Sequence, residues 1–153
     1  MRRFAEFLYL LSITAWVGGT WCIGYLVAPV LFSSLSDRTL AGQLAGRMFE
    51  MIGWLGLAAA TYVAVFLLGR WGTKVFRRSV FWLVLVMALL VAAIQFGIQP
   101  LMAELKADAF PRDVMESIMR ERFAMWHGVS SILYLMQSLL GAWLIAWNQR
   151  GLR

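Results

Sequence analysis

The chain has 153 residues, of which 61% are apolar and only 14% are charged, and its formal net charge is +6. About a quarter of the residues in a typical soluble domain are charged, so this composition excludes an ordinary water-soluble protein. The single cysteine, Cys22, excludes an internal disulfide and any paired-cysteine metal or redox motif. We expect one transmembrane domain over residues 1–153, because almost nothing remains for a separate aqueous domain.

Four segments contain no Asp, Glu, Lys or Arg: residues 7–32, 51–69, 79–103 and 123–149. A helix needs about 20 apolar residues to cross the hydrocarbon core of a membrane, and each segment approaches or exceeds that length. The sequence therefore predicts an all-α, polytopic membrane protein with four transmembrane helices in a bundle. The predicted helices cover about 6–32, 39–69, 79–102 and 123–148.

The first predicted helix is rich in small residues. Gly18, Gly19 and Gly24 are expected to let neighbouring helices approach closely, because packing must hold a membrane bundle together. Pro29 cannot donate a hydrogen bond to the carbonyl of Tyr25, so we expect a kink near the end of this helix.

The loop over residues 103–122 mixes acidic and basic side chains with apolar residues at helical spacing. These apolar residues are Val114, Met115, Ile118 and Met119. The pattern predicts a short amphipathic helix on the membrane surface.

Basic residues gather in the short second loop, which carries Arg70, Lys74, Arg77 and Arg78. Loops rich in Lys and Arg stay on the cytoplasmic side. We therefore expect a multi-pass protein of the plasma (inner) membrane with both termini in the cytoplasm. The basic residues are then partners of membrane lipids, and since no nucleic-acid motif occurs we expect no nucleic acid partner.

Four short patterns in the first half of the chain resemble the transmembrane-protein-205-like family. They are residues 16–19 (WVGG), 28–32 (APVLF), 41–42 (AG) and 46–49 (GRMF). The resemblance implies a four-helix membrane domain of a family found in bacteria and animals. It brings no established catalytic residues to this chain.

Polar residues recur on single faces of the last two predicted helices, with His127, Ser131, Tyr134 and Ser138 on the fourth. Polar groups inside a membrane face the bundle interior or a wet cavity. They can fix helix packing by interhelical hydrogen bonds, which is the commoner role, or they can form a polar pocket open to the outer side. The candidate pocket residues are Arg47, Glu50, Gln95, Gln99, His127, Ser131 and Tyr134.

Arg47 and Glu50 are three residues apart and can meet on one helix face. An unpaired charge at membrane depth is unfavourable, so we expect the two side chains to form an ion pair. His127 and Gln99 are expected to lie beside that pair in the same pocket.

Metal binding stays open, although we expect no cofactor. His127 is the only histidine, so it cannot complete a zinc site, and a haem would need a second chain or a methionine as its other ligand. Methionine is a soft ligand suited to Cu(I) but also a common apolar filler. The methionines expected toward the outer side are Met48, Met51, Met102, Met115, Met119 and Met125.

The sequence contains no nucleotide-binding loop, nucleophile elbow, zinc motif or carboxylate pair, so we expect no enzyme and no catalytic residues. Three functions stay open. The first is a self-associating membrane bundle that binds or passes a small hydrophobic or soft solute. The second is a non-catalytic accessory or scaffold subunit of a membrane assembly, and the third is a haem or soft-metal protein.

Overall fold

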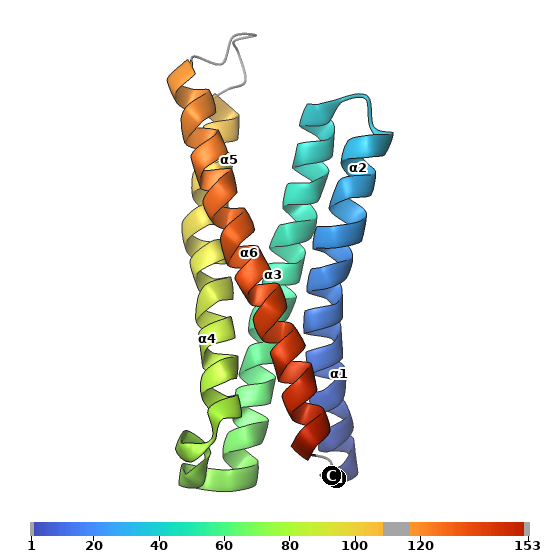
Figure 1. Ribbon diagram of the computed structural model, residues 1–153, viewed down its shortest axis with the longest axis vertical. Coiled ribbons are helices and arrows are strands. Elements are labelled where there is room, and N and C mark those ends of the chain that lie inside the picture. Colours follow the sequence, from blue (N-terminus) through green and yellow to red (C-terminus); the bar gives the residue numbers. More distant parts are fainter. Residues whose placement is uncertain (1, 109–116, 152–153) are drawn as a thin grey trace.

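The computed structural model describes residues 2–108 and 117–151, which contain helices and no strand (Figure 1). The elements in chain order are α1 (Arg2–Trp21), the π-helix η1 (Cys22–Val27), α2 (Ala28–Ser34), α3 (Arg38–Trp71), the 3₁₀-helix η2 (Gly72–Arg77), α4 (Ser79–Ala93), the π-helix η3 (Ile94–Ile98), α5 (Gln99–Asp108) and α6 (Ser117–Gly151).

Four of the described helices are long and apolar enough to cross a membrane, which confirms the all-α, four-helix prediction. They are Arg2–Ser34, Arg38–Arg77, Ser79–Glu104 and Ala124–Asn148. The short helix expected in the third loop lies partly outside the described residues, because Val114 and Met115 fall there. Ile118 and Met119 are already part of α6 rather than of a separate helix.

The turn between α2 and α3 is set by Asp37. Its side chain accepts hydrogen bonds from the backbone N–H groups of Thr39 (2.8 Å) and Leu40 (3.1 Å). These are two of the N–H groups that a helix start leaves without an internal partner. At the other end of α3, Gly72 takes a positive φ of 54°, which stops the helix before the basic loop.

Each π-helix ends two residues before a proline. Val27 ends η1 before Pro29, and Ile98 ends η3 before Pro100. A proline inside a helix removes one backbone donor and crowds the carbonyl four residues earlier. The structure has a wider helical turn just before Pro29, where we expect a kink, and the same arrangement recurs before Pro100.

The helices form two hairpins that meet at one end and diverge at the other (Figure 1). One hairpin runs from α1 through α3, and the other runs from α4 through α6. At the end where α1 starts and α6 finishes, which we call the closed end, α1 packs on α3 and α6, and α4 packs on the same two helices. The opposite end, where α2 turns into α3, is the open end.

Polar contacts fasten the closed end. The Arg70 Nη1 atom lies 2.8 Å from the Glu6 carboxylate, and the Tyr62 hydroxyl donates to the Ala5 carbonyl at 3.2 Å. The Arg78 guanidinium lies 5.2 Å from the centre of the Trp71 ring, within cation–π range. The basic loop is thereby tied to the start of α1.

The apolar core also lies toward the closed end and is built by all four spans. Its buried members are Tyr9, Ile13, Trp16, Val17, Ala59, Ala60, Val63, Leu67, Val75, Val80, Phe81, Val84, Met87, Val91 and Leu144. In lipid the exclusion of water does not drive helices together, so the close packing of these side chains has to stabilise the bundle.

Two glycines make the closest packing of this core possible. A Cβ atom at Gly56 of α3 would lie 2.7 Å from the indole nitrogen of Trp16, and one at Gly141 of α6 would lie 2.9 Å from Val17. Trp16 is 1% exposed, so its ring has no room to retreat. Only a residue without a side chain fits at either position.

The expectation for Gly18 is wrong. This residue is exposed, and a Cβ atom there would meet nothing within 4 Å, because it points about 100° away from its buried neighbour Val17. Gly19 faces the flexible end of Ile52, and Gly24 faces the ring of Tyr134, so these two do lie at helix contacts.

Gly56→Leu should destabilise the folded protein by about 1–3 kcal/mol, the usual range for over-packing a tight site. Gly69→Leu is the matched control, because it makes the same change on the same helix where a Cβ atom meets nothing within 4 Å. Thermal unfolding in detergent should show a lower melting temperature for the first variant only. Equal melting temperatures for the two variants would contradict the role given to Gly56.

Candidate functional site

A cavity of about 1350 Å³ lies between the two hairpins toward the open end. It is not sealed, since Tyr25, Phe32 and His127 line it and are also exposed. The wall formed by α3 includes four glycine or alanine residues, namely Gly42, Ala45, Gly46 and Gly53. These residues leave the space that larger side chains would fill.

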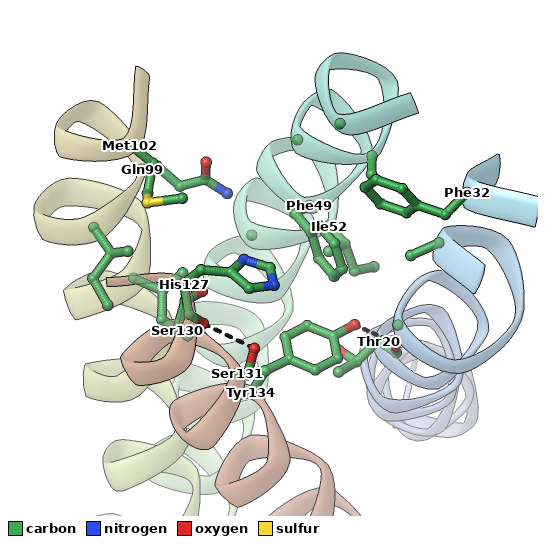
Figure 2. A pocket seen from close by; sticks show the side chains of 18 of the residues that line it. Thr20, Phe32, Phe49, Ile52, Gln99, Met102, His127, Ser130, Ser131 and Tyr134 are labelled. Carbon is green, nitrogen blue, oxygen red and sulfur yellow. Dashed lines mark hydrogen bonds between the residues drawn. The ribbon is translucent and has the colours of Figure 1, made fainter. Parts of the chain in front are cut away.

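Apolar side chains make most of the rest of the wall. Figure 2 shows Phe49 and Ile52 of α3 facing the cavity, with Phe32 of α2 beside them. Ile94 and Ile98 of η3 contribute from the other hairpin. The two π-helices therefore lie on opposite walls of the same cavity.

One side of the cavity is polar. His127 and Ser131 of α6 and Gln99 of α5 line it, and in Figure 2 the imidazole and the Gln99 amide point into the space between the hairpins. The Ser131 hydroxyl donates to the backbone carbonyl of His127 at 2.8 Å. The Ser131 hydroxyl therefore already donates its hydrogen bond within α6.

Tyr134 spans the cavity and joins the hairpins. Its hydroxyl donates to the Thr20 backbone carbonyl, and its ring meets Phe49 edge-on at a centroid distance of 5.1 Å (Figure 2). Gly24 lies directly against the ring, so any side chain at that position would displace it. Tyr134 thus connects α6 with α1, η1 and α3.

Two glutamine amides are buried at the inner part of this region. Gln137 lines the cavity and is 4% exposed, and neither its amide oxygen nor its amide nitrogen has a hydrogen-bond partner among the described residues. Gln95 of η3 is 7% exposed and lies against Gly53, with an amide oxygen that also lacks a partner there. Most buried polar side-chain atoms in proteins are hydrogen-bonded, so these amides are exceptional.

Charged groups lie only near the mouth. The acidic and basic residues among the described lining are Asp37 and Arg38, both at the turn between α2 and α3. The Asp37 carboxylate is already engaged in capping α3. The inner part of the cavity is therefore polar but uncharged.

The structure brings together some of the residues predicted from sequence. Gln99, His127, Ser131 and Tyr134 line the cavity, and Gln95 adjoins it through Gly53. Ser138 is buried but does not line the cavity.

Arg47 and Glu50 are exposed and do not line the cavity. They form no ion pair with each other. The salt bridge found among the described residues joins Arg70 to Glu6 instead. The cavity-facing positions of α3 include Gly46 and Phe49, each one residue earlier, so the two charged side chains point elsewhere. The predicted ion pair is therefore wrong, and an exposed pair would have contributed little stability.

Two features of the site were not predicted from the sequence. Gln137 was not among the expected pocket residues, although it lies one turn beyond Tyr134. The small residues of α3 were also missed, although Gly42, Gly46, Gly53 and Gly56 recur on one helix face. That recurrence was the pattern that could have located the cavity wall.

The described residues contain no group of three or more His, Cys, Asp or Glu side chains that could hold a metal ion. Of the methionines considered for soft metals, Met102 lines the cavity, whereas Met51 and Met125 are exposed. The side chains of Met115 and Met119 lie outside the described part of the chain.

In a comparison with known protein families, residues 11–111 match the domain of unknown function DUF4149. The chain belongs to this family. The matched region includes the first hairpin from residue 11 onward and the π-helix before Pro100. No curated protein and no solved structure matches the chain.

Tyr134→Phe should lower stability by about 1 kcal/mol, the usual size of an interhelical hydrogen bond in a membrane, while keeping the ring in place. Tyr25→Phe removes an exposed hydroxyl from the same aromatic cluster and serves as the control. The measurement is the melting temperature in detergent. A loss of equal size in both variants would show that the bond to Thr20 contributes nothing specific.

Proposed function

We propose that this protein binds a small amphiphilic molecule of the membrane in the cavity between its hairpins. The observation that carries the proposal is the cavity itself, about 1350 Å³ in volume and lined by apolar side chains with polar side chains among them. Small-molecule sites are typically concave, mostly apolar and supplied with a few placed polar groups. Protein interiors are usually close-packed by side chains. Here the small residues of α3 leave a space open.

The geometry fits a membrane-soluble ligand better than a water-soluble ion. Phe32, Phe49 and Ile52 offer contact to an apolar body, and the buried amide of Gln137 offers hydrogen bonds to a polar group. A charged solute would meet no charged partner in the inner part of the cavity. Removing an ion from water without such a partner is strongly unfavourable.

Orientation in the membrane follows from the basic loop. Arg70, Lys74, Arg77 and Arg78 lie at the closed end, together with the start of α1 and the end of α6. The preference of such loops for the cytoplasm supports cytoplasmic termini in a plasma (inner) membrane. The open end of the cavity would then be on the outer side. The resemblance to the transmembrane-protein-205-like family, carried by the patterns of the first half, fits the same placement.

Filling the cavity should abolish ligand retention. Gly42 lines the cavity, and a Cβ atom there has only Phe32 nearby at 3.9 Å, so Gly42→Trp would place an indole in the space. Gly69→Trp, which adds the same ring where nothing lies within 4 Å, is the control. Native mass spectrometry of the protein purified in mild detergent should show a bound small molecule in the parent and the control but not in Gly42→Trp.

If the parent carries no bound mass, or if all three proteins carry the same one, the binding proposal is wrong. Melting temperatures of the three proteins show whether Gly42→Trp is folded. A second protein chain retained with the parent, in place of a small molecule, would favour the accessory-subunit function instead.

A membrane-impermeant reagent should leave tags at both termini unlabelled in intact cells, because the basic loop shares their end. A cysteine introduced at Ser36, in the turn of the open end, should be labelled from outside. Cys22 is exposed along η1, so it is first replaced by alanine. Labelling of either terminus in intact cells would overturn the orientation.

A further inference from the structure

We propose that Gln137, together with Gln95, binds an uncharged hydrogen-bonding head group of the ligand at the inner part of the cavity. This inference rests on the proposed function, since it names which end of the amphiphile enters first and which class of head group it carries. The apolar part of the ligand would extend from the glutamines toward Phe49 and Phe32 nearer the mouth.

The state of the Gln137 amide carries the proposal. The side chain is 96% removed from solvent and lines the cavity, yet its oxygen and nitrogen have no partner among the described residues. A buried polar group left without a hydrogen bond destabilises a protein. A glutamine that only fixed helix packing would bond across to another helix, and Gln137 does not.

Gln95 strengthens the assignment because it has a similar property on η3, a neighbouring element of the same hairpin. Its amide oxygen is buried without a partner among residues 2–108 and 117–151, and the absence of a Cβ atom at Gly53 leaves room for the side chain. The segment η3 packs against both α6 and α3. Two amides from two elements that pack together therefore border the same inner region, each with hydrogen-bonding capacity to spare.

The head group must be uncharged. An amide offers a donor and an acceptor but no charge, and the charged lining residues Asp37 and Arg38 lie at the mouth. Gln137 lies ten residues along α6 from His127, about 15 Å along the helix axis, so it is well inside the span. Alcohols, amides and ketones suit such a site, whereas carboxylates and ammonium groups would be buried without a counter-charge.

The test uses three probes with the same twelve-carbon chain: 1-dodecanol, 1-chlorododecane and dodecanoate. Binding of tritiated 1-dodecanol to the full-length protein in detergent is measured by scintillation proximity, with Gly42→Trp as the background. The variants are Gln137→Leu and, as a control, Thr61→Val, which removes a hydroxyl from an exposed position on α3 outside the cavity. Unlabelled probes then compete with the tritiated alcohol.

We expect 1-dodecanol to bind the parent at least about tenfold more tightly than 1-chlorododecane or dodecanoate, and Gln137→Leu to lose that preference. Without ligand, Gln137→Leu should melt at the same temperature as the parent or higher, because an unpartnered buried amide has been removed. Thr61→Val should bind all three probes as the parent does. Loss of affinity without loss of stability is a result that a purely structural glutamine would not give.

Three outcomes would overturn the assignment. If Gln137→Leu keeps the preference for the alcohol, the head group lies elsewhere while ligand binding in the cavity stands. If this variant melts lower without ligand and its probe selectivity is unchanged, Gln137 is structural, with water as its partner. If 1-dodecanol does not bind above the Gly42→Trp background and the purified parent carries no small molecule, the proposed function fails as well.

Discussion

The hydrogen bond from Tyr134 to the Thr20 carbonyl joins the two hairpins at the cavity. Toward the closed end the spans share a continuous core around Trp16 and Leu144. Toward the open end they enclose the cavity. Tyr134 also rests on Gly24 and Phe49, so this side chain from α6 contacts both η1 and α3 of the other hairpin.

Small residues give opposite results at two levels of α3, near its start and near its middle. At Gly56 the missing side chain lets Trp16 approach, which produces the tightest contact of the core. At Gly42 and Gly46 the missing side chains face the cavity. Membrane helices are commonly held together at small residues. In α3 the same residue type therefore serves packing at one level and space at another, depending on whether the facing helix is near or has turned away.

The four spans were predictable because long segments without charges leave few other structures in a chain of this length. The orientation of each helix about its own axis was not predictable in the same way. Gly18 and Gly56 look alike in sequence, yet one is exposed and the other holds the Trp16 contact. The predicted ion pair of Arg47 and Glu50 was wrong for the same reason, since their spacing allows a pair but does not say which face of α3 turns inward.

The polar residues of α6 were a partial success. The face that carries His127, Ser131 and Tyr134 does line the cavity. A pattern of polar positions cannot show which hydrogen bonds are made, however, and that information distinguishes Tyr134 from Gln137. Tyr134 meets a backbone carbonyl across the bundle, whereas Gln137 meets none of the described groups. The three-dimensional structure is needed to distinguish a polar residue that fixes packing from one whose hydrogen-bonding groups stay unpaired.

The two π-helices have a consequence for how such a protein can change over generations. Their hydrogen bonds run from residue i to i+5, so each ring encloses one more residue than the ring of an α-helix. Adding or deleting one residue in such a segment turns the remaining part of the same helix by about 100° about its axis. The core side chains of α1 precede η1, and those of α4 precede η3. A single-codon insertion or deletion in either segment could therefore present a different cavity wall to the ligand while leaving the packed half of the bundle in register.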